Sequence, residues 1–422
     1  MSVNNDGGTL AAAAPTWHIR ARTGFLTDLG FVDEFELLLV DGVIAWIGYA
    51  GSEVPRPDVS GAVLMEYPTG TLLPGLIDPH VHLTFSGHAD TVDILHTEDE
   101  IGATVRALGN AQRALRHGVT TQVDCGSRGS IVLRLREALE RDLAIGPRIL
   151  SAGAPLTTTA GHCHWLGGHA DSLDEVIRAA RTRVAEGADL VKIMLTGGNM
   201  TAGSNPSALQ YPSEVMLALG AEAARLAKPL VVHAHSDEAV RLAALARARV
   251  IAHATCLRDG KYELSEATLE AILESGAYVD PTLMVGLPRE GADERALARS
   301  KVREAMLPIY REMHKRGVPL LAGTDGGATN VEHHNVAGSV VALHEEVGLS
   351  IEAALLAATD LPARAFGLRD EVGALEVGLA ADVVVVDADL HSHLRALADP
   401  SAVWSRGRLV HGSGQKHAGV LR

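Results

Sequence analysis

The stretch that decides the fold is Leu72-Leu73-Pro74-Gly75-Leu76-Ile77-Asp78-Pro79-His80-Val81-His82. It predicts an apolar strand that ends at two histidines separated by one residue. Side chains alternate between the two faces of a strand, so His80 and His82 are expected to point the same way. Two imidazoles on one face supply half of a site for zinc or a similar metal. Two surface histidines would fit the same pattern, so the interpretation depends on what accompanies them.

The composition restricts the class of protein. A chain of 422 residues is long enough for a (β/α) barrel with an appendage. The net charge of −15 and the 4% aromatic content argue against nucleic acid or an anionic membrane as a partner. Three widely spaced cysteines form no disulfide framework, and neither a secretory signal nor a membrane-spanning stretch is recognisable. We therefore expect a soluble, cytoplasmic protein.

Both ends of the chain have β character. Short apolar runs at 36–40 and 43–48 flank Asp41-Gly42, which is a typical hairpin turn. A similar apolar run occupies 383–386, near the C-terminus. These patterns predict a small β-sandwich domain built from both termini around a different central domain. The expected domain limits are residues 1–73, 74–365 and 366–422.

The central part alternates between short apolar runs and helical patterns. The apolar runs are 75–78, 119–124, 148–152, 190–195, 230–235, 250–253, 278–281 and 320–325. Eight strands that alternate with helices predict a (β/α)8 TIM barrel over 74–365. A doubly wound open sheet would give a similar pattern, but no Gly-x-Gly-x-x-Gly turn follows the first strand.

Chemistry-bearing side chains recur where the predicted strands end, which is where barrels place their active sites. They are His80 and His82 (first strand), Lys192 (fourth), His233 (fifth), His253 (sixth) and Asp325 (eighth). Each alone could be a buried histidine or a loop cap. A buried ammonium is costly unless its charge is paired or lost. A lysine carbamylated by CO2 would instead be a carboxylate able to bridge two cations. Together these residues predict a metal centre.

The chain resembles the amidohydrolase superfamily at these positions and in the flanking segments. The resemblance is carried by 74–82, Lys192, His233, His253, Asp325 and the late segment 373–383. Within the superfamily it is most similar to the imidazolonepropionase-related branch, which includes Xaa-Pro and Xaa-Arg dipeptidases and ochratoxin-type amidases. The segments that carry the branch resemblance are 159–162, 191–194, 210–214 and 233–235.

The resemblance implies a binuclear metal site. His80, His82 and Asp325 would hold one divalent ion, and His233 and His253 would hold the other. N6-carboxylated Lys192 would bridge the two ions, which are expected to be Zn2+. A bridging hydroxide would attack the scissile carbonyl, while Asp325 would move the proton to the departing amine.

Two further residues receive roles from the resemblance. Tyr211 would polarise the scissile carbonyl, and His162 would contact the substrate. Four more histidines near predicted strand ends are expected to be loop residues or partners of ligands: His164, His169, His333 and His334. Possible carboxylate-binding arginines are Arg128, Arg258 and Arg289.

Hydrolysis of an amide bond in a small N-acyl amino acid or dipeptide is the favoured function, in a homo-oligomer. Cleavage of a carbamate, thiocarbamate or urea is chemically close to it. A mononuclear deaminase or cyclic amidohydrolase is a further alternative, although such enzymes usually lack the bridging lysine. A vestigial, non-enzymatic barrel is disfavoured because every expected ligand is present.

Overall fold

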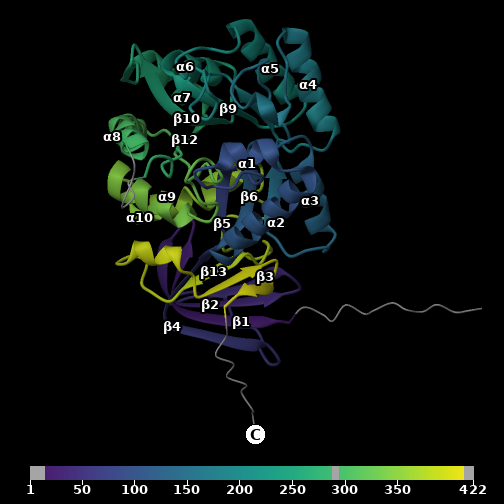
Figure 1. The fold of residues 1–422 in the computed structure, drawn as a ribbon. Helices are drawn as coiled ribbons and strands as arrows, with labels where there is room; N and C mark the ends of the chain where they lie inside the picture. Colours follow the sequence, from purple (N-terminus) through teal and green to yellow (C-terminus); the bar gives the residue numbers. More distant parts are fainter. Residues whose placement is uncertain (1–14, 288–293, 413–422) are drawn as a thin grey trace, which may run out of the picture.

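The computed structural model describes residues 15–287 and 294–412. Arg289, one of the arginines considered above, lies outside these ranges. In Figure 1 the first and last parts of the chain, drawn purple and yellow, lie together below the α/β part formed by the middle of the sequence. No helix in the described ranges is long and apolar enough to cross a bilayer.

The lower part contains a seven-stranded sheet drawn from both ends of the chain. Its strands are β1 (Trp17–Leu26), β2 (Gly30–Val40), β3 (Val43–Gly48), β4 (Val63–Pro74), β13 (Val383–Val386), β14 (Ala402–Ser405) and β15 (Arg408–His411). The strand order is β15-β14-β13-β4-β1-β2-β3. Strands from both ends of the chain therefore share one sheet, and Asp41-Gly42 joins β2 to β3 as predicted. A second sheet packed as a sandwich stays a prediction, as do the domain limits.

The upper part is built around parallel strands. One sheet has the order β5-β6-β7, with β5 (Leu76–Val81), β6 (Val119–Asp124) and β7 (Arg148–Ser151). The other pairs β8 (Val191–Met194), β9 (Leu230–Ser236), β10 (Val250–Arg258) and β12 (Tyr278–Asp280) in parallel, and adds the antiparallel β11 (Lys261–Tyr262).

Isolated bridges connect further segments. Leu156 pairs with Ile193, Val279 with Leu320, and Val81 with Gly326, all in parallel. Leu320 is the residue of the predicted run at 320–325 that takes part in these bridges, and the run is not itself a continuous strand.

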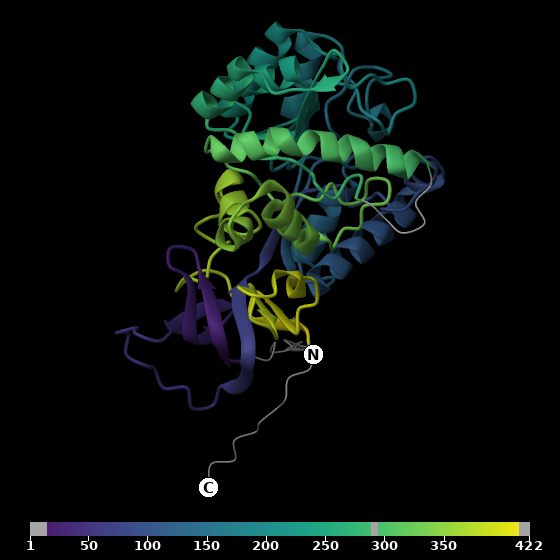
Figure 2. The same ribbon diagram turned by 90° about the vertical axis from the view of Figure 1, so that its left-hand side faces the viewer.

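Helices surround the parallel strands in Figures 1 and 2. They are α1 (Thr91–Thr97), α2 (Glu100–Arg116), α3 (Ile131–Glu140), α4 (Leu173–Ala185), α5 (Ser213–Arg225), α6 (Asp237–Leu245), α7 (Glu266–Ser275), α8 (Glu294–Lys315), α9 (Val336–Ala342), α10 (Ile351–Leu356) and α11 (Asp360–Ala365). Three short non-α helices are η1 (His164–Leu166), η2 (Leu343–Val347) and η3 (Leu394–Ala398).

Local sequence explains several of these boundaries. Ser172 and Glu175 form a reciprocal capping box at the start of α4, which satisfies backbone N–H groups that have no partner within the helix. Gly276 ends α7 in a left-handed conformation, with φ of +69°. Between β4 and β5, a Cβ at Gly75 would lie 2.1 Å from Thr120 Oγ1. Only glycine lets the first parallel strand follow the end sheet so closely.

Candidate metal centre and active site

The first group of predicted ligands lies where β5 ends. His80, His82 and Asp325 each offer a ligand atom within 4.8 Å of the others. Asp325 Oδ1 is 3.3 Å from His82 Nε2 and 3.6 Å from His80 Nε2. The backbone N–H of Asp325 donates to the carbonyl of His80, which ties the loop that carries Asp325 to β5. Residues more than 240 positions apart in the sequence therefore meet.

Hydrogen bonds orient both imidazoles of this group. His80 Nδ1 donates to Asp280 Oδ2 at 2.8 Å, and His82 Nδ1 donates to the Gly126 carbonyl at 2.8 Å. Because both acceptors lack a proton to give, each Nδ1 carries the hydrogen and each Nε2 keeps its lone pair. Carboxylate and carbonyl partners of this kind fix the tautomer of metal-binding histidines and raise their basicity.

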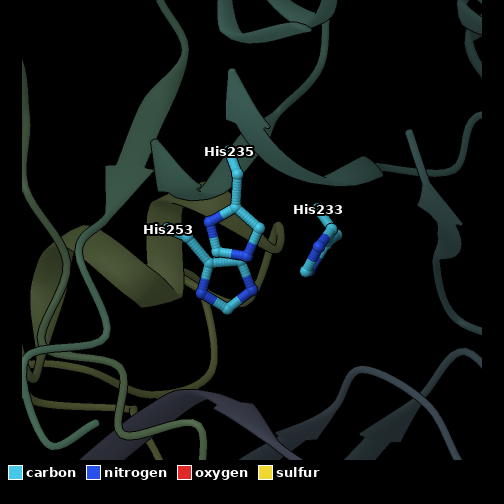
Figure 3. Close-up of side chains that lie close together, drawn as sticks. All are labelled: His233, His235 and His253. Atoms are coloured by element: carbon cyan, nitrogen blue, oxygen red, sulfur yellow. The ribbon is translucent and has the colours of Figure 1, made fainter. Parts of the chain in front are cut away.

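Three histidines form the second group, shown in Figure 3: His233 and His235 from β9, and His253 from β10. The rings of His235 and His253 stack with their centroids 4.8 Å apart, and the His233 ring lies 4.6 Å from that of His253. His253 Nδ1 is hydrogen-bonded to Thr282 Oγ1 at 2.9 Å. The His253 ring is also 5.4 Å from that of His80, so the two groups are neighbours.

Lys192 lies in β8 beside both groups. The residue is 2% exposed, and its Nζ has no hydrogen-bond partner in the part of the chain that the structure describes. It lines the same cavity as His80, His253 and Asp325, and an ammonium at this position contributes to lowering their pKa values. A buried amine without a partner is costly, so this position calls for a further group or a modification that removes the charge.

The electrostatics favour metal binding. Burial lowers the pKa of His80, and lowers those of His233 and His253 far below the ordinary value, so their imidazoles are neutral at pH 7. Burial raises the pKa of Asp325, but its neighbours in the cavity, Lys192 among them, favour the charged form and hold the pKa of this carboxyl below its ordinary value. Neutral imidazoles and a carboxylate are the donors that zinc and similar divalent ions prefer. The residues present therefore fit the implied metals.

A cavity of about 320 Å³ joins the two groups. Both histidine groups, Lys192, Asp325 and His162 line it, together with apolar side chains that include Phe85 and Met194. A concave site with a few convergent polar groups and an apolar remainder is typical of small-molecule binding sites.

A comparison with models of protein families identifies the family of the chain. The model of the family described as "Amidohydrolase family" matches residues 71–410. The chain belongs to this family. Its members named as enzymes indicate a hydrolase that acts on carbon–nitrogen bonds, and the resemblance inferred from the motifs is confirmed.

Individual relatives agree with the family assignment. The chain is 25% identical over 415 residues to ochratoxinase of Aspergillus niger, covering 90% of this chain and 83% of that protein. It is 26% identical over 419 residues to imidazolonepropionase of Shewanella halifaxensis, covering 90% and 94%. A crystal structure of a Xaa-Pro dipeptidase with bound methionine shares the fold, with a TM-score of 0.82, 23% identity and coverage of 93% and 99%.

Of the other histidines considered from the sequence, some lie at the cavity and others do not. His162 lines the cavity, and its ring lies 4.7 Å from that of His233. Burial lowers the pKa of His162 to about 3. His333 Nε2 donates to the His82 carbonyl at 3.0 Å, as expected for a partner of a ligand. His164 and His169 stack on each other and, like His334, do not line the cavity.

Tyr211 is not brought to the cavity. Its ring lies in the hydrophobic core at 1% exposure, and its hydroxyl donates to the Ala170 carbonyl at 2.8 Å. The predicted contact with a scissile carbonyl would require this bond to break. We therefore do not include Tyr211 in the proposed mechanism.

Replacing Tyr211 with phenylalanine tests this placement. Because the ring is kept, we expect kcat and KM to change by less than about threefold, which corresponds to well under 1 kcal/mol. Loss of the buried hydrogen bond should lower the free energy of unfolding by about 1 kcal/mol. Steady-state kinetics and urea unfolding measure the two effects. A fall in kcat of about a hundredfold with KM unchanged would restore the predicted electrophile.

Sequence reasoning missed two residues of the site. His235 belongs to the second histidine group, and its position two residues after His233 on the same strand was an available signal. Asp280 orients His80 from β12 and is fully buried. The sequence gives no sign of that pairing, because 200 residues separate the partners.

The buried histidines also predict how stability depends on pH. Burial lowers the pKa of His333 to about 4, whereas an unfolded histidine titrates near 6.5. Between these pH values the unfolded chain binds more protons, so the free energy of unfolding should fall as the pH is lowered, by up to about 3 kcal/mol for this residue. Urea unfolding of metal-free protein from pH 7.5 to 4.5 measures it. In His333→Asn the free energy of unfolding should depend less steeply on pH than in the wild-type protein. Equal pH dependence in the two proteins would contradict the lowered pKa of His333.

Proposed function

We propose that the protein is a binuclear metal-dependent amidohydrolase that cleaves the amide bond of a small molecule, such as an N-acyl amino acid or a dipeptide. One observation carries the proposal: two neighbouring groups of side chains that could hold metal ions line one cavity together with a buried lysine, which has no protein partner in the described ranges. The relatives named ochratoxinase and imidazolonepropionase support hydrolysis of carbon–nitrogen bonds.

The proposed metal ligands are taken from the two groups of side chains described above. His80, His82 and Asp325 would hold one ion, and His233 and His253 the other, with N6-carboxylated Lys192 shared between them. The expected ions are Zn2+. When bound, they would supply Lewis-acid polarisation of the carbonyl and lower the pKa of a water molecule.

The side chains of this protein would move the proton and position the substrate. Asp325, which is ionised, accepts the proton of the attacking water and delivers it to the departing amine. His162 lines the same cavity and is neutral at pH 7, so it can donate one hydrogen bond to a substrate oxygen. The apolar remainder of the lining excludes water and strengthens these interactions.

The barrel is part of the same proposal. We propose that the parallel strands and the segment 320–326 form a (β/α)8 barrel within 74–365, with the β domain from 1–73 and 366–422. The bridges of Leu156 with Ile193, Val279 with Leu320, and Val81 with Gly326 support it, because they join segments that neighbouring barrel strands would pair. A cytoplasmic location and a homo-oligomeric state also stay predictions.

A release assay tests the function directly. Enzyme prepared with zinc and bicarbonate is incubated with N-acyl amino acids, dipeptides and aryl amides, beside carbamates and heterocyclic amines. The proposal predicts release of free amine and carboxylic acid from members of the amide set. Activity confined to carbamates, or ammonia release from heterocycles without amide cleavage, would contradict it.

A further inference from the structure

The longest helix of the described chain supplies one wall of the cavity. This helix, α8, runs across the molecule as the long green helix in Figure 2. Five residues on it line the cavity: Ala298, Arg299, Val302, Arg303 and Met306. Their spacing of three and four residues places them on one face of the helix.

Two hydrogen bonds fix α8 against the site. Tyr310 donates from its hydroxyl to the His253 carbonyl at 2.7 Å, which joins the helix to a strand of the second histidine group. Arg303 Nε donates to the Leu283 carbonyl at 2.8 Å. The cavity-facing side of α8 is therefore held in register with the proposed metal ligands.

The basic side chains that line the cavity differ in whether they already have an acidic partner. Apart from Lys192, which the proposed function modifies, two basic side chains line the cavity: Arg299 and Arg303. Arg303 is paired in a two-pronged contact with Glu346, at 2.5 and 2.8 Å. Within residues 15–287 and 294–412, Arg299 makes no hydrogen bond or ion pair. Asp325 is the one carboxylate among the described residues of the lining, and it belongs to the first ligand group.

Arg128 and Arg258, the described arginines that were considered from the sequence, do not line the cavity. Arg128 donates to the Glu98 carbonyl at 2.9 Å and does not line the cavity, and Arg258 is exposed on the far end of β10. The guanidinium available to an anionic group in the cavity is that of Arg299.

We propose that Arg299 binds a carboxylate of the substrate, so that the enzyme prefers amides of amino acids with a free carboxyl group over neutral amides. The inference rests on the proposed function. A guanidinium presents a planar fork that matches a carboxylate and stays charged at any working pH. Val302 and Met306 line the cavity beside it and are apolar, which favours an apolar group next to the carboxylate.

A comparison of two substrates with two variants tests Arg299. The acid is the N-acyl amino acid that the wild-type enzyme cleaves fastest, and its neutral analogue carries an N-methylcarboxamide in place of the carboxylate. Arg299→Met should lower kcat/KM for the acid at least about tenfold, mainly through KM, and leave the neutral analogue within about twofold. Arg299→Lys should give an intermediate loss, because the charge remains but the fork is lost.

Lys301→Met is the matched control. Lys301 lies on the same helix, is exposed and does not line the cavity, so its loss removes the same charge without touching the proposed contact. Lys301→Met should leave kcat/KM unchanged for both the acid and the neutral analogue. Equal losses on acid and neutral analogue in Arg299→Met, or no loss, would overturn the inference. Wild-type enzyme that cleaves both compounds equally would overturn it while amide hydrolysis stands, whereas cleavage of no amide in the panel would overturn the proposed function itself.

Discussion

Replacing Lys192 with alanine is expected to abolish most activity and to reduce the metal content of the protein. The side chain is buried, lines the same cavity as both proposed ligand groups and has no partner among the described residues. If it is carboxylated, it supplies the one carboxylate that both ions share, and alanine supplies none. Metal analysis and steady-state kinetics on the same preparation measure the two losses.

Three further measurements make the lysine experiment specific. Lys192→Glu should recover part of the metal binding, because it restores a carboxylate near the same place. Short carboxylic acids added to the alanine variant should restore part of the turnover. Lys301→Ala, which removes an exposed lysine, should behave like wild type. Wild-type metal content and rate in Lys192→Ala would contradict the carboxylated bridge.

Replacing Asp325 with asparagine is expected to lower kcat by at least about a hundredfold, the usual scale for losing a general acid–base group. The amide keeps the shape of the side chain but cannot accept the proton of an attacking water. The carboxylate is ionised and lies 3.3 Å from His82 Nε2, so the substitution should also weaken one ligand set.

The two effects of the Asp325 substitution are separated by measuring metal content on the assayed sample. Asp142→Asn is the control, because Asp142 is exposed and only pairs with Arg408 at the surface. It should leave kcat unchanged. A variant of Asp325 that keeps its metals and its full rate would remove this residue from the mechanism.

The proposed metal ligands could be predicted as one cluster because most of them lie on or next to a parallel strand with its own local signal. His80 and His82 are on or next to β5, Lys192 is within β8, and His233 and His253 are on β9 and β10. Parallel strands bring their carboxyl ends to one edge, so the order of these residues along the chain was enough to place them together.

The helices followed the same local rules. The pattern at 173–186 corresponds to α4, and that at 213–227 to α5, to within two residues. By contrast, the run at 320–325 joins its neighbours only through isolated bridges. The run ends at Asp325, which adopts a left-handed conformation with φ of +59°. A turn of this kind has no signature in a run of apolar residues.

Contacts set by packing were not predictable from the sequence. Tyr211 has the same neighbours in sequence whether its hydroxyl faces a substrate or the Ala170 carbonyl, and the Ala170 carbonyl lies 41 residues away along the chain. Arg299 looks like any charged residue of a surface helix. Only the three-dimensional position of α8 shows that Arg299 lines the cavity and that Arg303 is already paired with Glu346.

The most direct test of the account is the number of metal ions that full activity requires. Metal-free protein is titrated with zinc in the presence of bicarbonate, and amide hydrolysis and bound metal are measured at each point. Two adjacent ligand groups and one shared lysine predict that activity reaches its maximum at two ions per chain. Maximal activity at one ion per chain would contradict the binuclear site and favour a mononuclear deaminase-like enzyme.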